Sequence, residues 1–204
     1  MVLYTMSSKN IKTRTRILEA AWKQLAAGMG GEVRMTDIAK TAGISRQAVY
    51  LHFPTRAELL IATTRHLDEI NNVDARLAPS RIAATGLERL DCFIEAWGNY
   101  IPEIHGVAKA LIAMQDTDEA AKMAWADRMA AVRDGCQAAV KALKNDGALS
   151  PDYSVKEATD ILWSILSMQT WEQLTQQCRW SQHRYIKAMK ELAKNGLVIE
   201  PASH

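Results

Sequence analysis

Apolar residues recur at helical spacing along nearly the whole chain. The first set, at positions i, i+1, i+4, i+5 and i+8, comprises Ile17, Leu18, Ala21, Trp22 and Leu25. Such a set forms one apolar face of an amphipathic helix, and the glycines between residues 28 and 31 would end that helix. Alternating runs of β-branched residues, which are typical of strands, are absent. The pattern predicts an all-α protein.

Residues 36–60 predict two short helices and the start of a third. The first helix has an apolar face made of Ile38, Ala39 and Ala42. Gly43 can supply the positive φ of a sharp reversal, and Ser45 is a good N-cap for a second helix over residues 46–53. A helix, a tight glycine turn and a second helix form a helix-turn-helix.

The second helix of this motif has one apolar and one polar face. Ala48, Val49 and Phe53 can pack inward. The positions left outside are Ser45, Arg46, Gln47, Tyr50 and His52. In the major groove arginine can pair with guanine and glutamine with adenine, while hydroxyl groups can donate to phosphates. The helix is therefore predicted to read duplex DNA, although each side chain taken alone could equally be a solvated surface residue.

A third helix should begin directly after this motif. Pro54 prevents the preceding residue from continuing as helix, and Thr55 and Glu58 have the spacing of a capping box. Arg56 is thereby held beside the second helix.

These residues resemble the DNA-binding domain of the tetracycline-repressor (TetR) family. The resemblance is carried by I-A-x-x-A-G-I-S from Ile38 and by Y-x-H-F-x-x-R-x-x-L-L from Tyr50, and it covers about residues 10–70. It implies that Tyr50 and Arg56 contact phosphates, and that two chains form an Ω-shaped homodimer through their last two long helices. A small hydroxyl residue often found near position 34 is Arg34 here, so the first helix of the motif either is capped at Thr36 or begins near Arg34.

Candidate DNA contacts follow from the polar face and from the resemblance together. They are Arg34, Thr36, Lys40, Ser45, Arg46, Gln47, Tyr50, His52, Thr55 and Arg56. Charge supports this end of the chain as the DNA-binding end, because residues 1–60 hold nine Lys and Arg against four Asp and Glu, whereas the remainder holds 16 against 19. Residues 1–9 are expected to form a mobile arm, which could lie along DNA or do nothing.

The rest of the chain predicts a helical bundle. The third helix is expected to continue over residues 59–70 and to link a DNA-binding domain at residues 10–70 to a ligand-binding and dimerisation domain at residues 71–204, with Pro79 in the break that follows it. Further helices are expected over residues 87–101, ended by Pro102, and over residues 104–112. Three more are expected over residues 119–144, from a capping box at Ser154 towards Leu174, and from Ser181 to Gly196.

Two sets of residues in the second domain are candidates for binding. The apolar arc around residues 161–166 is wider than one stripe and needs a second partner. The predicted dimer interface comprises Ile161, Leu162, Ile165, Met168, Tyr185 and Met189.

Tryptophan and methionine line apolar pockets but also fill ordinary cores. The candidate ligand-binding residues are Trp97, Tyr100, His105, Met114, Trp125, Met129, Cys136 and Trp163.

Residue patterns that are characteristic of other functional classes are absent from the chain. The three cysteines are widely spaced, no metal-ligand or nucleophile pattern occurs, and G-M-G-G has no following lysine of a phosphate-binding loop. No apolar run is long enough for a membrane span or a signal peptide. We therefore expect a cytoplasmic protein, associated with the nucleoid when bound to DNA, without enzymatic activity, metal or other cofactor.

The predicted function is transcriptional regulation. We expect a homodimeric repressor that binds a palindromic DNA operator and is released by a small hydrophobic or aromatic ligand. A helical protein-interaction module with no DNA role is the alternative. The two differ in salt dependence, since DNA binding weakens steeply as salt rises.

Overall fold

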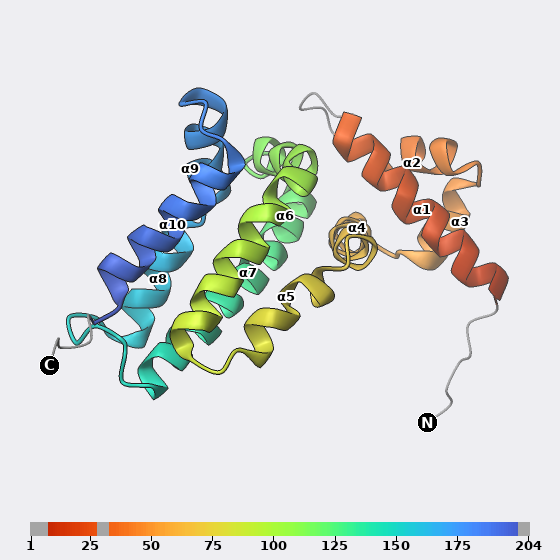
Figure 1. The fold of residues 1–204 in the computed structure, drawn as a ribbon. Coiled ribbons are helices and arrows are strands. Elements are labelled where there is room, and N and C mark those ends of the chain that lie inside the picture. Colours follow the sequence, from red (N-terminus) through yellow and green to blue (C-terminus); the bar gives the residue numbers. More distant parts are fainter. Residues whose placement is uncertain (1–7, 28–32, 200–204) are drawn as a thin grey trace, which may run out of the picture. The chain divides into compact units, whose positions relative to one another are not determined.

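The computed structural model describes residues 8–27 and 33–199, and nearly all of them lie in helices (Figure 1). Within the described residues the one extended pairing is an isolated antiparallel bridge between Leu149 and Val198. The predicted all-α fold is confirmed. Most of the predicted N-terminal arm and the glycine-rich loop after the first helix lie outside the described residues.

The helices form two compact units, and two long helices contribute to both. One unit comprises the chain up to Ile70 together with Gly106–Arg128, and the other comprises Asn71–His105 together with the chain from Met129 onward. The shared helices are α6 (Gly86–Met114) and α7 (Glu119–Asn145). The predicted division at residue 70 stays a prediction, because the first unit also takes in the adjoining ends of α6 and α7.

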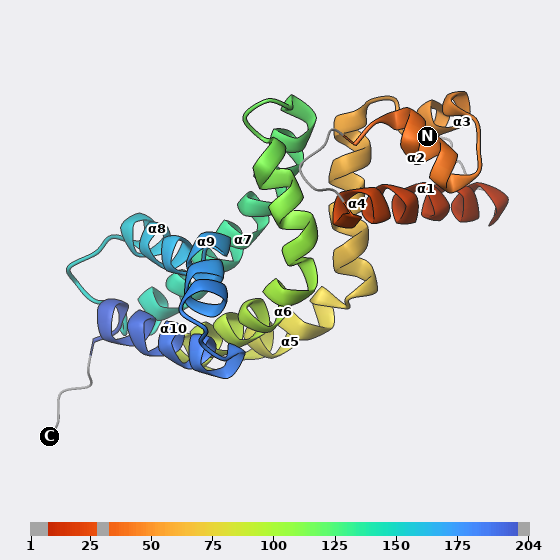
Figure 2. The same cartoon turned by 90° about the horizontal axis from the view of Figure 1, so that it is seen from above.

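The first unit contains the helix-turn-helix. Its own helices are α1 (Ser8–Ala27), α2 (Met35–Ala42), α3 (Arg46–His52) and α4 (Arg56–Ile70). The apolar face predicted for α1 is buried in a core shared with α2, α4 and the ends of α6 and α7. Helix α1 packs against both α2 and α4 (Figure 2).

Local sequence explains the turn between α2 and α3. Gly43 adopts the left-handed conformation (φ 65°), and its N–H caps the carbonyls at the end of α2. The Ser45 side chain accepts a hydrogen bond from the Ala48 N–H, as predicted for an N-cap. The start of the motif is also settled, because α2 begins at Met35 with Arg34 as its N-cap residue and Thr36 inside its first turn. The proposed cap at Thr36 is therefore wrong.

The second unit is the bundle. It contains α5 (Val73–Ile82), α8 (Val155–Ile165), α9 (Met168–Glu172), the π-helix η1 (Gln173–Gln177) and α10 (Gln182–Leu197), with the remaining parts of α6 and α7. Both bonds of the predicted capping box form between Ser154 and Glu157, and Ser181 caps α10 by accepting from the Arg184 N–H. These two helix starts are confirmed.

Two predicted boundaries at prolines are wrong. Pro79 lies inside α5, and the chain turns instead at Asn72, which has a left-handed conformation (φ 51°). Pro102 lies inside α6, which continues to Met114. A proline removes the N–H that would bond to the carbonyl four residues earlier. At Pro102 that carbonyl belongs to Gly98, and it accepts a hydrogen bond from Gln182 Nε2 at 2.6 Å instead.

The helix predicted to run from Ser154 towards Leu174 is interrupted. It ends at Ile165, and Leu166 makes the last-turn bond to the Leu162 carbonyl. The Ser167 side chain then accepts from the Thr170 N–H and starts α9. Apolar periodicity continues through this break, so the serine cap rather than the periodicity marks the true boundary.

Candidate nucleic-acid interface

The faces of α3 follow the predicted division at most positions. Val49 is fully buried and Phe53 is 2% exposed, so this side anchors the helix to its unit. Ser45, Arg46, Gln47 and Tyr50 are exposed, as expected of base-edge and phosphate contacts.

Two positions on α3 differ from the predicted division. His52 is half-buried beside the packed face. Leu51 is 81% exposed and belongs to the outer face, although sequence reasoning did not include it. Its spacing of four residues from Gln47 could have identified it, because residues four apart share a helix face.

Residues of α1 hold the motif in place. The Arg14 guanidinium lies over the Phe53 ring, 4.8 Å from its centroid. Arg16 donates a hydrogen bond to the Ala42 carbonyl at the end of α2. Arg14 and Arg16 of α1 therefore brace the helix-turn-helix.

Arg46 and Tyr50 form a pair on the outer face of α3. Arg46 Nη2 donates to the Tyr50 hydroxyl at 3.3 Å, and the guanidinium lies 5.4 Å from the centre of the tyrosine ring. The pair presents a cation and a hydroxyl oxygen side by side. Both are suited to a phosphate or a base edge.

Arg56 lies in a different environment from these exposed residues. Its Nε donates to the Val33 carbonyl at 2.5 Å, its Nη1 donates to Asp118 at 2.6 Å, and its side chain is only 17% exposed. Burial raises the pKa of Asp118, but the hydrogen bonds and charge of Arg56 and the N–H groups of Ala121 and Ala120 outweigh that effect and hold the pKa below its ordinary value. Arg56 therefore joins the start of α4 to the start of α7 within one unit.

The remaining candidate DNA contacts are exposed near α2 and α4. Arg34, Thr36 and Lys40 are exposed at the start of α2 or along it. Thr55 is exposed as well, and its hydroxyl accepts from the Glu58 N–H at 3.2 Å, which is one half of the predicted capping box.

The candidate ligand-binding residues do not form one cluster. Met114 and Trp125 belong to the core of the first unit, and the others lie in the second. Trp97 is buried, and its indole N–H donates to the Leu166 carbonyl at 2.8 Å. Tyr100 and Cys136 are buried too, and burial raises the pKa of each to about 12. These three side chains are parts of the core of the second unit.

The other candidates in the second unit are partly accessible. His105, Met129 and Trp163 are half-buried. The imidazole of His105 lies 4.9 Å from the Trp171 ring, between ring centroids, and its Nε2 is 3.4 Å from Glu172.

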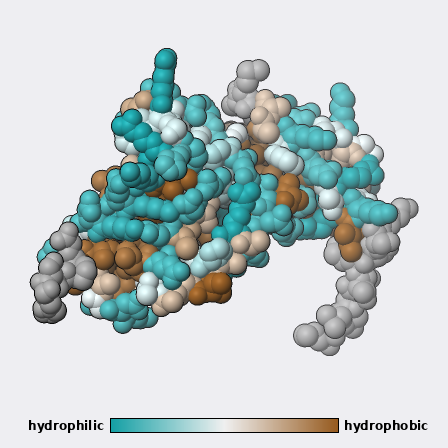
Figure 3. All heavy atoms as spheres, viewed as in Figure 1, coloured by the Kyte–Doolittle hydropathy of each residue, from teal (hydrophilic) through white to brown (hydrophobic). Residues whose placement is uncertain are grey.

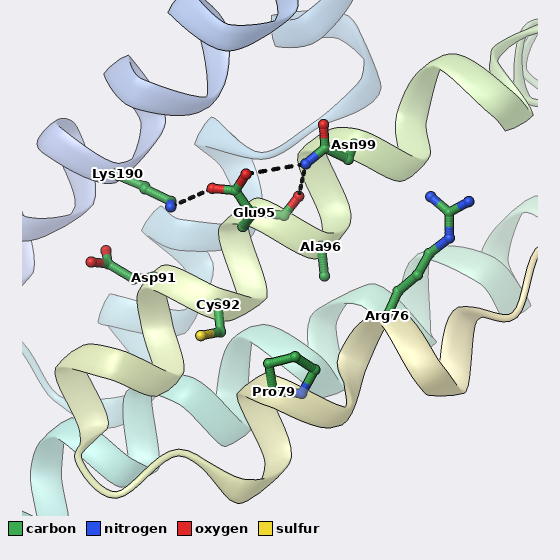
Figure 4. A pocket seen from close by; sticks show the side chains of 8 residues that line it. All are labelled: Arg76, Pro79, Asp91, Cys92, Glu95, Ala96, Asn99 and Lys190. Carbon is green, nitrogen blue, oxygen red and sulfur yellow. Dashed lines mark hydrogen bonds and ion pairs between the residues drawn. The ribbon is translucent and has the colours of Figure 1, made fainter.

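A separate pocket of about 390 Å³ lies between α5, α6 and α10 (Figure 4). Its lining residues are Arg76, Pro79, Asp91, Cys92, Glu95, Ala96, Asn99 and Lys190. Lys190 and Glu95 form an ion pair of 2.5 Å across one side. The pocket contains none of the candidate ligand-binding residues, so the sequence did not identify it.

The candidate dimer residues divide by burial. Leu162, Met168, Tyr185 and Met189 are buried within their own chain, whereas Ile161 and Ile165 are half-buried. Figure 3 shows hydrophobic residues at the surface over the ends of α8 and α10. Of the candidate set, only the two isoleucines are accessible enough to meet another chain.

Two further observations concern the part of the chain that the structure describes. It contains no group of three or more His, Cys, Asp or Glu residues that could hold a metal ion. None of its helices combines the length and the apolar character needed to cross a membrane.

Comparison with known proteins shows the family. Residues 17–63 match the model of bacterial regulatory proteins, tetR family. The chain is 30% identical to the HTH-type transcriptional regulator CymR of Pseudomonas putida over 178 residues, which cover 79% of this chain and 81% of CymR. It is 36% identical to the HTH-type transcriptional regulator TtgR, also of Pseudomonas putida, over 69 residues, 34% of this chain and 33% of TtgR.

Other similarities are shorter or more distant. Two further curated relatives are matched over 32% and 37% of their length, so the chain spans about a third of several relatives. The structure of NalD, the secondary repressor of the MexAB-OprM multidrug efflux pump in Pseudomonas aeruginosa, has a TM-score of 0.67 at 20% identity, covering 96% of this chain and 100% of NalD. That likeness shows a shared fold. Because CymR is matched over most of both chains and the helix-turn-helix matches the family model, this chain belongs to the TetR family of bacterial regulatory proteins.

Proposed function

We propose that the protein is a DNA-binding transcriptional repressor that reads its operator with α3. The observation that carries the proposal is the outer face of this helix, where Arg46, Gln47 and Tyr50 are exposed while Val49 is fully buried. The braces from Arg14 and Arg16 hold this face in place without help from DNA. A prearranged polar face costs little ordering entropy on binding.

The charge distribution supports the same function. Nine Lys and Arg against four Asp and Glu in residues 1–60 attract a polyanion, and the remainder of the chain is slightly acidic. A homodimer would present two α3 helices to half-sites about 34–36 Å apart, one turn of duplex, or a near multiple of that distance. A repressor that binds bacterial operator DNA would act in the cytoplasm, where the chromosome lies.

Selection of duplexes from a random library, followed by titration of the chosen duplex at several salt concentrations, tests the proposal. We expect a preferred sequence and a binding constant that falls steeply with salt. Arg46→Ala or Gln47→Ala should reduce the free energy of binding to the preferred duplex by about 1–3 kcal/mol and relax base preference. Tyr50→Phe should instead weaken binding to all duplexes alike. Binding that is absent or indifferent to salt would contradict a DNA role.

Release by a small molecule is the second part of the proposal. The pocket between α5, α6 and α10 has a volume within the range of ligand sites. Its lining combines apolar Pro79 and Ala96 with charged side chains of both signs, which are Arg76, Lys190, Asp91 and Glu95. These residues suit a small hydrophobic or aromatic body that carries a polar group. A ligand that prefers the released geometry by about 2.7 kcal/mol would lower operator affinity roughly a hundredfold.

A panel of aromatic cations and aromatic carboxylates provides the test. Compounds that change the tryptophan emission of the full-length protein should weaken operator binding over the same concentration range. Ala96→Phe, which occupies part of the pocket without adding a tryptophan, should abolish that response and leave ligand-free operator affinity unchanged. A response that survives Ala96→Phe would remove this pocket from the proposal.

A further inference from the structure

The outer face of α3 contains an apolar side chain that no other part of the described unit covers. Leu51 is 81% exposed, although Leu59 and Leu60, a few residues further along, are fully buried. A single exposed leucine on a protein surface is ordinary. Its position on α3 makes this one informative.

Two parallel rows of side chains make up the outer face. One row is Arg46 and Tyr50, which bond to each other. The other row is Gln47 and Leu51, one helical turn apart. Val49 lies two residues from both Gln47 and Leu51, on the side of α3 opposite their row, and it is fully buried, so the Gln47–Leu51 row faces directly away from the core.

Base edges in the major groove offer one apolar group, the C5 methyl of thymine. The end of a leucine side chain can enclose such a methyl, whereas it has no hydrogen bond to offer a phosphate. Glutamine is complementary to adenine N6 and N7. Gln47 and Leu51 are separated by about 6 Å along the helix axis, and successive bases on one strand by about 3.4 Å. The row therefore spans about two base steps.

We propose that Leu51 is a specificity-determining residue that recognises the C5 methyl of thymine within one or two base pairs of an adenine read by Gln47. The inference rests on the proposed function, because it requires α3 to lie in the major groove. It gives a role in base readout to a side chain of α3 that itself has no polar group. The expected half-site contains an A·T pair beside a thymine.

Replacement of thymine by deoxyuridine isolates this contact, because it removes the methyl and keeps every hydrogen bond of the base. The full-length protein and its Leu51→Ala variant are titrated with the library-selected duplex, in which each thymine is replaced in turn. For the wild type, one or two positions should weaken binding about fourfold per methyl removed. For Leu51→Ala, those same replacements should have no effect.

Gln47→Ala is the matched control on the same row. It should lose adenine discrimination and retain the wild-type response to deoxyuridine. Since Leu51 is exposed, Leu51→Ala should unfold at the wild-type temperature, which separates loss of contact from loss of fold. An equal response to deoxyuridine in wild type and Leu51→Ala, or no response at any thymine, would overturn the assignment. A failure to select any duplex would instead contradict the proposed function itself.

Discussion

At the scale of single residues, Arg56 shows how a candidate phosphate contact can have a structural role. Its guanidinium is 17% exposed and bonded to both Asp118 and the Val33 carbonyl. A surface ion pair contributes little to stability, but removing one partner of a largely buried pair leaves the other charge uncompensated.

We expect Arg56→Ala and Asp118→Asn each to lower the free energy of unfolding by about 1–3 kcal/mol, and the double variant to lose less than the sum. Urea titration measures all three. Arg65→Ala is the control, because Arg65 also pairs with a carboxylate, Asp127, but is 62% exposed; its loss should stay below about 1 kcal/mol. Equal losses at both arginines would show that burial of the Arg56 pair does not matter.

The pH dependence of the same variants has a definite sign. The folded-state pKa of Asp118 lies below its ordinary value, so its contribution to stability is present above that ordinary value and is lost as the pH falls through the folded-state pKa. Asp118→Asn should therefore flatten the acid limb of the stability profile. If the stability of Asp118→Asn fell as steeply at acid pH as that of the wild type, other carboxylates would be responsible for the acid limb.

At the scale of elements, α6 stays continuous through Pro102 because another helix supplies the missing hydrogen bond. Gln182 at the start of α10 donates to the Gly98 carbonyl, and its own side-chain oxygen accepts from the Trp171 indole at 2.9 Å. One amide side chain thus satisfies two buried groups. The arrangement connects α6, α9 and α10 within the second unit.

Gln182→Ala should cost about 1–3 kcal/mol of unfolding free energy, since it leaves a carbonyl and an indole N–H without partners. In a Pro102→Ala background the restored backbone N–H can bond to Gly98 within the helix, so the same substitution should cost less. A double-mutant cycle by chemical denaturation gives the difference. Strict additivity would mean that the Gln182 amide does not replace the bond that Pro102 removes.

Close approach of α6 and α7 is a second feature of the elements. A Cβ added at Gly135 of α7 would lie 2.7 Å from Cζ of Phe93 on α6, whereas one added at Gly106 of α6 would meet nothing within 4 Å. Phe93 is 6% exposed, so its ring has little room to move. Glycine at position 135 therefore permits the packing of the two helices.

Gly135→Ala should destabilise the protein by about 1–3 kcal/mol through overpacking. Gly106→Ala is the matched control, and it should stabilise by about 0.5–1 kcal/mol because alanine is the better helix former. Thermal unfolding followed by circular dichroism distinguishes the two. A stabilising Gly135→Ala would show that the Phe93 ring moves aside at no cost.

At the scale of the whole molecule, the proposed homodimer depends on residues that the fold of one chain leaves uncovered. Leu162 is fully buried within its chain, while Ile165, three residues later on α8, is half-buried. A charge at the first position disrupts a core, and a charge at the second reaches the surface of a folded chain.

Ile165→Glu should therefore give a folded monomer, and Leu162→Glu should give an unfolded chain. Sedimentation velocity reports the mass, and far-ultraviolet circular dichroism reports the helix content of both variants. The monomer should also lose most of its affinity for a two-half-site duplex, because only one α3 can bind. A wild type that is monomeric at micromolar concentration would remove the dimer and its half-site spacing.

Much of the local structure follows from the sequence alone. The turn at Gly43, the caps at Ser45, Ser154 and Ser181, and the buried position of Val49 all depend on residues within one helical turn of one another. Such contacts are encoded by spacing, because a cap or an amphipathic face needs no partner distant in the chain to be recognised. The family resemblance rests on the same local motif.

Only the tertiary structure shows which distant residues provide hydrogen-bond partners for buried groups. The Gly98 carbonyl, which Pro102 leaves without a bond inside α6, accepts from Gln182, and the largely buried Arg56 donates to Asp118. Trp97 is a core residue, and its indole N–H donates to the Leu166 carbonyl. In each case the partner lies more than sixty residues away, and a sequence pattern does not show which distant group will satisfy a carbonyl, a guanidinium or an indole N–H.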